Sequence, residues 1–172
     1  MKVTVIGGAG AFGARLCTML ARDGHQVTVA GRDLARAQAL AAQIGGQALR
    51  LNRGGDLAGL TGAEVVIDAA GPFRADGPKF GPKTGPKSGR DSLPDPWHVA
   101  RACIAGGMHY LDLSDNAAFT AGIGALDADA RAAGVAVLSG VSSVPALSSA
   151  AVAALAQGLD RVDSIDGAIL PV

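Results

Sequence analysis

The sequence is poor in cysteine, in aromatic side chains and in net charge. Cys17 and Cys103 are the only cysteines in 172 residues, too few for a disulfide scaffold or a four-thiolate zinc site. Basic and acidic side chains both number 15, so the chain has no positive excess to attract nucleic acid or an anionic membrane. The composition argues against disulfide-rich secreted proteins and general nucleic-acid binders.

Long hydrophobic runs are also missing. The uncharged stretch 132–159 is long enough to span a bilayer, but it is interrupted by polar or helix-breaking residues: Gly140, Ser142, Ser143, Pro145, Ser148 and Ser149. At the N-terminus, Lys2 is followed by a short strand-like run and then by glycines, unlike a secretory signal. The sequence predicts no membrane partner and, with two unpaired thiols, a cytoplasmic protein.

The chain does contain regularly alternating elements, and 49% of its residues are hydrophobic. Apolar and β-branched runs predict strands, and the stretches between most of them have helical spacing. This alternation is typical of an α/β fold with a doubly wound parallel sheet of the Rossmann type, here one domain over residues 1–172. Strands are predicted at 2–7, 25–30, 47–52, 64–70, 110–113, 135–138 and 162–170, and helices at 11–22, 33–43, 96–105, 117–133 and 145–157.

One segment, at about 74–95, breaks the alternation. Residues 77–88 repeat a four-residue Gly-Pro-Lys unit three times, and residues 74–91 carry five positive and two negative charges. Gly-Pro units sustain neither a helix nor a central strand, so we expect a solvated low-complexity insert. The functional alternative is a cationic flap over a phosphate-bearing ligand.

A glycine-rich motif, G-x-G-x-x-G, links the first predicted strand to the first predicted helix. This strand–turn–helix context is typical of dinucleotide binding. A pyrophosphate needs the free N–H groups of a helix N-terminus, and side chains at the glycines would block the turn, the phosphate or the helix packing. The predicted cofactor-binding residues of this turn are Gly7, Gly8, Gly10, Ala11, Phe12 and Gly13.

The end of the second strand indicates which cofactor is bound. NAD-binding domains usually place a carboxylate there, whereas this chain has Arg32 followed by Asp33. A guanidinium can pair with the 2′-phosphate of NADP, and Arg36 could add a second positive charge. Asp33 could instead reach the ribose of NAD, although a helix-capping role is the simpler explanation. We therefore predict NADP, with NAD less favoured.

The carboxyl edges of later strands supply further candidates. Ala70, Gly71, Pro72 and Phe73 follow the fourth strand, where the nicotinamide half of a dinucleotide would lie, although an ordinary turn is an equal alternative. Asp68 and Asp112 lie inside strands and could be structural. The serines that follow the fifth and sixth strands match no hydrolase motif, and the histidines lack metal-ligand spacing, so no metal and no catalytic residue is predicted.

Taken together, the motifs resemble the N-terminal NADP-binding domain of the saccharopine dehydrogenase-like oxidoreductases. The resemblance rests on VIGGAGAFG (5–13), VTVAGRD (27–33), VVIDAAGPF (65–73), ACIAGGMHYLDLSD (102–115) and GVSSVPALSS (140–149).

The resemblance implies hydride transfer between a nicotinamide cofactor and an imine or related small substrate. It also implies a second α/β domain that builds the substrate pocket, and this sequence stops where that domain would start. We therefore expect NADP binding without turnover by this piece alone. A non-catalytic NADP-sensing or regulatory module is the alternative. The exposed edge left by a missing domain would favour a homo-oligomer of this chain.

Overall fold

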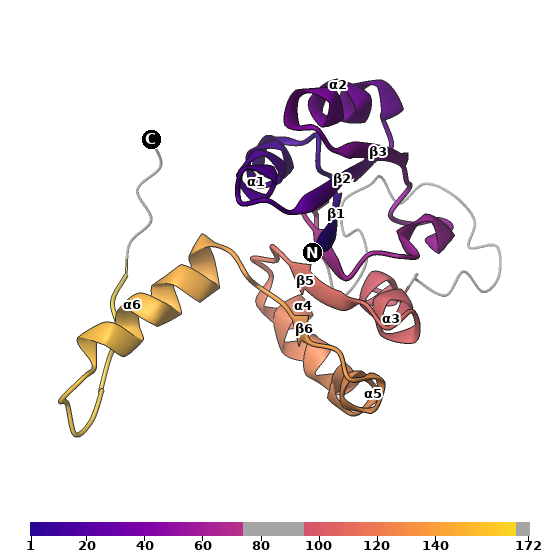
Figure 1. Cartoon of the computed structure of the whole chain (residues 1–172). Helices are drawn as coiled ribbons and strands as arrows, with labels where there is room; N and C mark the ends of the chain where they lie inside the picture. The colour runs from indigo at the N-terminus through magenta and orange to yellow at the C-terminus, as the bar shows by residue number, and fades with distance from the viewer. Residues whose placement is uncertain (74–94, 168–172) are drawn as a thin grey trace, which may run out of the picture.

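The computed structural model describes residues 1–73 and 95–167, which form a parallel sheet between two layers of helices (Figure 1). The strand order is β3-β2-β1-β4-β5-β6, and every neighbouring pair is parallel. This order confirms the predicted doubly wound sheet. The strands are β1 (Lys2–Ile6), β2 (Gln26–Gly31), β3 (Gln47–Arg50), β4 (Val65–Asp68), β5 (His109–Asp112) and β6 (Val137–Leu138).

Six α-helices and three short helical turns connect and follow the strands. The helices are α1 (Ala11–Arg22), α2 (Leu34–Ile44), α3 (His98–Ala105), α4 (Ala117–Gly122), α5 (Asp127–Ala133) and α6 (Ser148–Leu155). The turns are η1 (Ala58–Leu60), η2 (Ile123–Leu126) and η3 (Ser143–Leu147).

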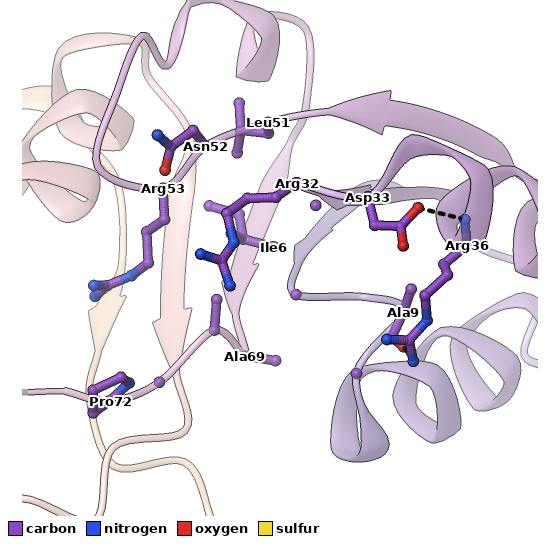
Figure 2. Close-up of a pocket in the computed structure, with 15 residues that line it drawn as sticks. Ile6, Ala9, Arg32, Asp33, Arg36, Leu51, Asn52, Arg53, Ala69 and Pro72 are labelled. Atoms are coloured by element: carbon purple, nitrogen blue, oxygen red, sulfur yellow. Dashed lines mark hydrogen bonds between the residues drawn. The ribbon is translucent and has the colours of Figure 1, made fainter.

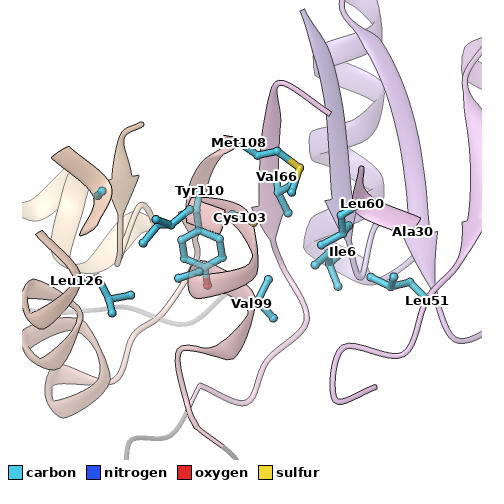
Figure 3. Close-up of a cluster of buried hydrophobic side chains, with 13 residues drawn as sticks. Ile6, Ala30, Leu51, Leu60, Val66, Val99, Cys103, Met108, Tyr110 and Leu126 are labelled. Atoms are coloured by element: carbon cyan, nitrogen blue, oxygen red, sulfur yellow. The ribbon is translucent and has the colours of Figure 1, made fainter. Parts of the chain in front are cut away.

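Each face of the sheet has its own apolar core, because successive side chains of a strand point to opposite faces. On one face, Val3 and Val5 of β1 pack with Cys17 of α1 and with Ala37 and Ala41 of α2. The other core joins strand residues to α3 and α5 (Figure 3). It contains Ile6, Leu60, Val66, Val99, Cys103, Tyr110 and Leu126, all of them buried. The sheet is therefore held from both sides, and its carboxyl edge is left for loops.

The predicted helix over 117–133 is wrong as one element. It is divided into α4, η2 and α5, because Gly122 and Gly124 weaken the helix at this point. Gly122 also has a packing role: a Cβ there would lie 2.3 Å from the Trp97 ring.

The predicted strand over 162–170 is also wrong for residues 162–167, which form no strand. They follow α6, which projects away from the sheet and has no buried residue (Figure 1). Val162 and Ile165 are exposed, and nothing brings this segment back beside β6. The predicted Gly-Pro-Lys insert, apart from Asp95, and residues 168–170 of that strand lie outside the described residues.

Both thiols should be unreactive in the folded protein. Burial raises the pKa of Cys17 to about 11 and that of Cys103 to about 12. At pH 8 only about one Cys17 in a thousand would be a thiolate, which is the reactive form. We expect a disulfide reagent such as DTNB to label neither thiol at pH 8 until denaturant is added. Rapid labelling of the native protein would contradict the packing of α1 and α3.

Candidate functional site

The glycine-rich turn between β1 and α1 has a shape that only glycine permits. Gly7 has φ +74°, and a Cβ there would lie 3.0 Å from Ala70 in the loop after β4. A Cβ at Gly13 would lie 2.2 Å from the carbonyl oxygen of Gly7. The turn is therefore folded tightly on itself and against the β4 loop, as a backbone-lined ligand site requires.

The N-terminus of α1 has free hydrogen-bond donors. The first N–H groups of a helix have no intrahelical partner, and Gly10 at the cap supplies no side-chain acceptor. In contrast, α2 is capped by Asp33, whose carboxylate accepts the backbone N–H of Arg36 at 3.1 Å. Because no acidic side chain lies in the first turn of α1, its positive end is available to an anion.

An open cleft of about 820 Å³ lies at the carboxyl edge of β1, β2 and β4, beside this turn (Figure 2). Seven predicted site residues line it: Gly7, Gly10, Arg32, Asp33, Ala70, Gly71 and Pro72. Arg36, which the sequence analysis named as a second positive charge, also lines the cleft. The structure adds Ile6, Ala9, Gly31, Leu51, Asn52, Arg53 and Ala69. The cleft thus brings together three separate segments that the sequence motifs mark.

Five predicted site residues do not line the cleft: Gly8, Ala11, Phe12, Gly13 and Phe73. Gly8 and Gly13 are packing positions, since a Cβ at Gly8 would lie 2.9 Å from the carbonyl oxygen of Val5. The Phe12 side chain is 80% exposed, whereas Phe73 is buried, with its ring centroid 5.4 Å from that of Phe119. Gly8, Gly13 and Phe73 therefore pack beneath the cleft, whereas the Phe12 side chain lies on the surface.

Arginines dominate the charge of the cleft. Arg32 and Arg36 come from the segment after β2, and Arg53 comes from the segment after β3 (Figure 2). Arg36 donates from Nη2 to the carbonyl oxygen of Ala9 at 2.9 Å, which ties α2 to the glycine-rich turn. Neither Arg32 nor Arg36 forms an ion pair with another residue in the described part of the chain. The end of the cleft near α2 is therefore suited to a negatively charged group.

Arg53 is the main residue that the sequence analysis missed. Its Nε donates to Oδ2 of Asp68 at 2.5 Å, and the Asp68 side chain is fully buried. Burial raises the pKa of Asp68, and the Arg53 charge acts in the opposite direction. Its position in the sequence could have indicated Arg53. Residues that follow the third parallel strand reach the same edge of the sheet as those that follow the first, second and fourth strands.

Asp112 holds the neighbouring loops together from the end of β5. Its Oδ1 accepts the N–H of Ser114 at 2.9 Å, the N–H of Gly140 at 3.0 Å and the hydroxyl of Ser139 at 2.9 Å. The residue is fully buried, which supports the structural role considered for it in the sequence.

In residues 1–73 and 95–167, no helix combines the length and the hydropathy needed to cross a bilayer. No three His, Cys, Asp or Glu side chains there are grouped so that they could hold a metal ion.

The strand order, the glycine-rich turn and the cleft define a Rossmann-type α/β domain of the class found in dinucleotide-dependent oxidoreductases. A model of the shikimate / quinate 5-dehydrogenase family matches residues 1–72. Among curated proteins, no significant match is found.

One solved structure resembles the chain over most of the chain's length. The chain is similar to saccharopine dehydrogenase (L-Glu forming) from Saccharomyces cerevisiae, with 25% identity and a TM-score of 0.57. The match covers 81% of this chain but 27% of the other, so the chain spans about a quarter of that enzyme's length. The resemblance to the saccharopine dehydrogenase-like oxidoreductases is thereby confirmed.

A second solved structure shows the same fold. GenD2 from gentamicin A biosynthesis, solved in complex with NAD, is 21% identical with a TM-score of 0.51. That match covers 81% of this chain and 34% of GenD2.

Proposed function

We propose that residues 1–172 form the NADP-binding domain of a saccharopine dehydrogenase-like oxidoreductase. The observation that carries the proposal is the cleft. It combines an uncapped helix N-terminus with Arg32 and Arg36, two arginines that have no carboxylate partner in the described part of the chain. A dinucleotide with an additional phosphate on one ribose matches this distribution of charge.

Each part of the cofactor has a proposed binding element. The pyrophosphate would lie on the free N–H groups of Ala11, Phe12 and Gly13 at the start of α1, because the N–H groups of Gly8 and Gly10 already donate to backbone carbonyl oxygens. Arg32 would hold the 2′-phosphate, with Arg36 beside it. Asp33 already accepts the N–H of Arg36, which favours its capping role over ribose binding. Ala70, Gly71 and Pro72 would border the nicotinamide, and the buried Phe73 would lie behind them.

When bound, the nicotinamide would supply or accept the hydride, and the protein would supply position and electrostatics. We propose an imine or related small molecule as the substrate of the full-length protein and no turnover by this chain alone. The alternative of an NADP-sensing module has no structural observation of its own. The cytoplasmic location and the homo-oligomer stay predictions.

Titration of NADPH and NADH by isothermal calorimetry tests the choice of cofactor. We expect the wild-type chain to bind NADPH more tightly, and Arg32→Ala to weaken NADPH binding by about 30-fold while leaving NADH nearly unchanged. A charge-assisted contact contributes about 2 kcal/mol, which corresponds to this factor.

Arg22→Ala is the matched control, because Arg22 is an exposed arginine at the opposite end of α1 from the turn. It should leave both affinities unchanged. Equal binding of the two cofactors by wild type, or a preference that survives Arg32→Ala, would refute the assignment of the 2′-phosphate site.

A further inference from the structure

We infer that Arg53 is a positioning residue that fixes the nicotinamide side of the cleft by holding both ends of the loop 69–73. The inference rests on the proposed function and adds a residue that determines how the second half of the cofactor is bound. It starts from the path of one side chain, which runs from the segment after β3 to the end of β4.

The two ends of the loop contact the same guanidinium. At the first end, Nε of Arg53 donates to Oδ2 of Asp68, the last residue of β4, at 2.5 Å. At the other end, Cζ of Arg53 lies 5.1 Å from the ring centroid of Phe73. Asp68 also accepts the N–H of Ala70 through Oδ1 at 3.1 Å, so its carboxylate joins the guanidinium to the loop backbone. Movement of Arg53 would therefore remove two direct contacts, one with Asp68 and one with Phe73, and would leave the carboxylate that holds Ala70 without its partner charge.

Arg53 is itself held in place. Its carbonyl oxygen accepts a hydrogen bond from Nε2 of His98, at the start of α3. The Phe73 ring packs on Phe119, whose ring centroid lies 6.1 Å from that of Trp97. A charged group paired with a fully buried carboxylate and stacked on an aromatic layer has few alternative positions.

The other end of the cleft does not depend on these contacts. Arg32 and Arg36 belong to the segment after β2, and Arg36 is tied to the carbonyl oxygen of Ala9. Figure 2 shows the Arg53 side chain near Pro72, and Arg36 beside Ala9 on the opposite side of Arg32. Loss of the Arg53 contacts should therefore weaken binding of the whole dinucleotide more than binding of its adenosine half.

The test compares NADPH with 2′,5′-ADP, which carries the adenosine half and the 2′-phosphate without nicotinamide. Arg53→Met alone would leave the buried Asp68 unpaired and endanger folding. The double variant Arg53→Met with Asp68→Leu replaces the pair by apolar side chains of similar size, which proteins often tolerate. Arg53→Lys keeps the charge but loses the planar group that contacts both partners.

We expect the double variant to stay folded, with a midpoint of thermal unfolding lowered only by the loss of the Asp68 acceptor for the Ala70 N–H. Its affinity for 2′,5′-ADP should stay within about twofold, and its affinity for NADPH should fall about tenfold or more, because misplaced contacts are costly. Arg53→Lys should recover part of the NADPH affinity. As a matched control, Arg131→Met with Asp127→Leu removes an exposed ion pair on α5 and should change neither affinity.

Equal losses for the two ligands would overturn the inference, because they would assign Arg53 to the adenosine end or to the fold as a whole. Unchanged NADPH binding would overturn it as well. A wild-type chain that binds neither ligand would instead refute the proposed function, so the two failures are distinguishable.

Discussion

Gly13→Ala should reduce NADPH affinity by a factor on the order of a hundred, since displacing a binding element by about 1 Å has effects of this size. The new Cβ would lie 2.2 Å from the Gly7 carbonyl oxygen and 2.8 Å from Cα of Gly8. Both atoms are backbone, so the turn or the whole of α1 must move away. Calorimetric titration of NADPH measures the effect directly.

The control for this experiment is Gly124→Ala, at a glycine whose added Cβ would meet nothing within 4 Å. It should bind NADPH like wild type and unfold within about 0.5 kcal/mol of it. If Gly13→Ala also binds NADPH like wild type, the close packing of the turn against α1 does not control the site.

Asp112→Ala should cause the largest loss of stability, about 3 kcal/mol or more in the free energy of unfolding. The substitution leaves the buried N–H groups of Ser114 and Gly140 without their acceptor, and it leaves the Ser139 hydroxyl with Thr120 alone, at 3.4 Å. Each buried donor without a partner costs about 1–3 kcal/mol. For a chain of this size the midpoint of thermal unfolding should fall by about 10 °C.

Asp115→Ala serves as the comparison, because Asp115 is exposed and lies three positions further along the chain. Its unfolding free energy should change by less than about 0.5 kcal/mol. Urea unfolding, followed by circular dichroism, measures both variants. A small effect at Asp112 would mean that the loops after β5 and β6 do not depend on this carboxylate.

Local patterns predicted the fold well where propensity and packing agree. Alternation of apolar runs with helical spacing located six strands, because each buried strand must be apolar on the faces that the helices cover. The predicted strand is absent over residues 162–167, because apolar residues alone do not create a neighbouring strand edge. Residues 162–167 follow the projecting helix α6 and form no strand. The prediction of one helix over 117–133 was wrong because Gly122 and Gly124 weaken the helix there. Gly122 is also the position on which the Trp97 ring packs, so the local sequence pattern alone could not show the break.

The residues of the candidate site also fall into two groups, those that local sequence patterns predicted and those that only the structure could place. Gly7, Gly10, Arg32, Asp33 and the loop from Ala70 to Pro72 were predicted and line the cleft, because each follows a strand whose carboxyl end reaches one edge. Whether the side chains of Phe12 and Phe73 line the cleft could be decided only from the tertiary structure. One aromatic side chain is exposed and the other is buried, and no local pattern distinguishes them.

The sequence by itself determined the parallel α/β architecture, the glycine-rich turn and the positive charge after β2, since these depend on residues close together in the chain. Only the tertiary structure decided that Arg53 pairs with Asp68 across 15 positions, and that Asp112 gathers donors from two loops. Such contacts form when separate strands are brought side by side, and strand order is a property of the whole folded sheet.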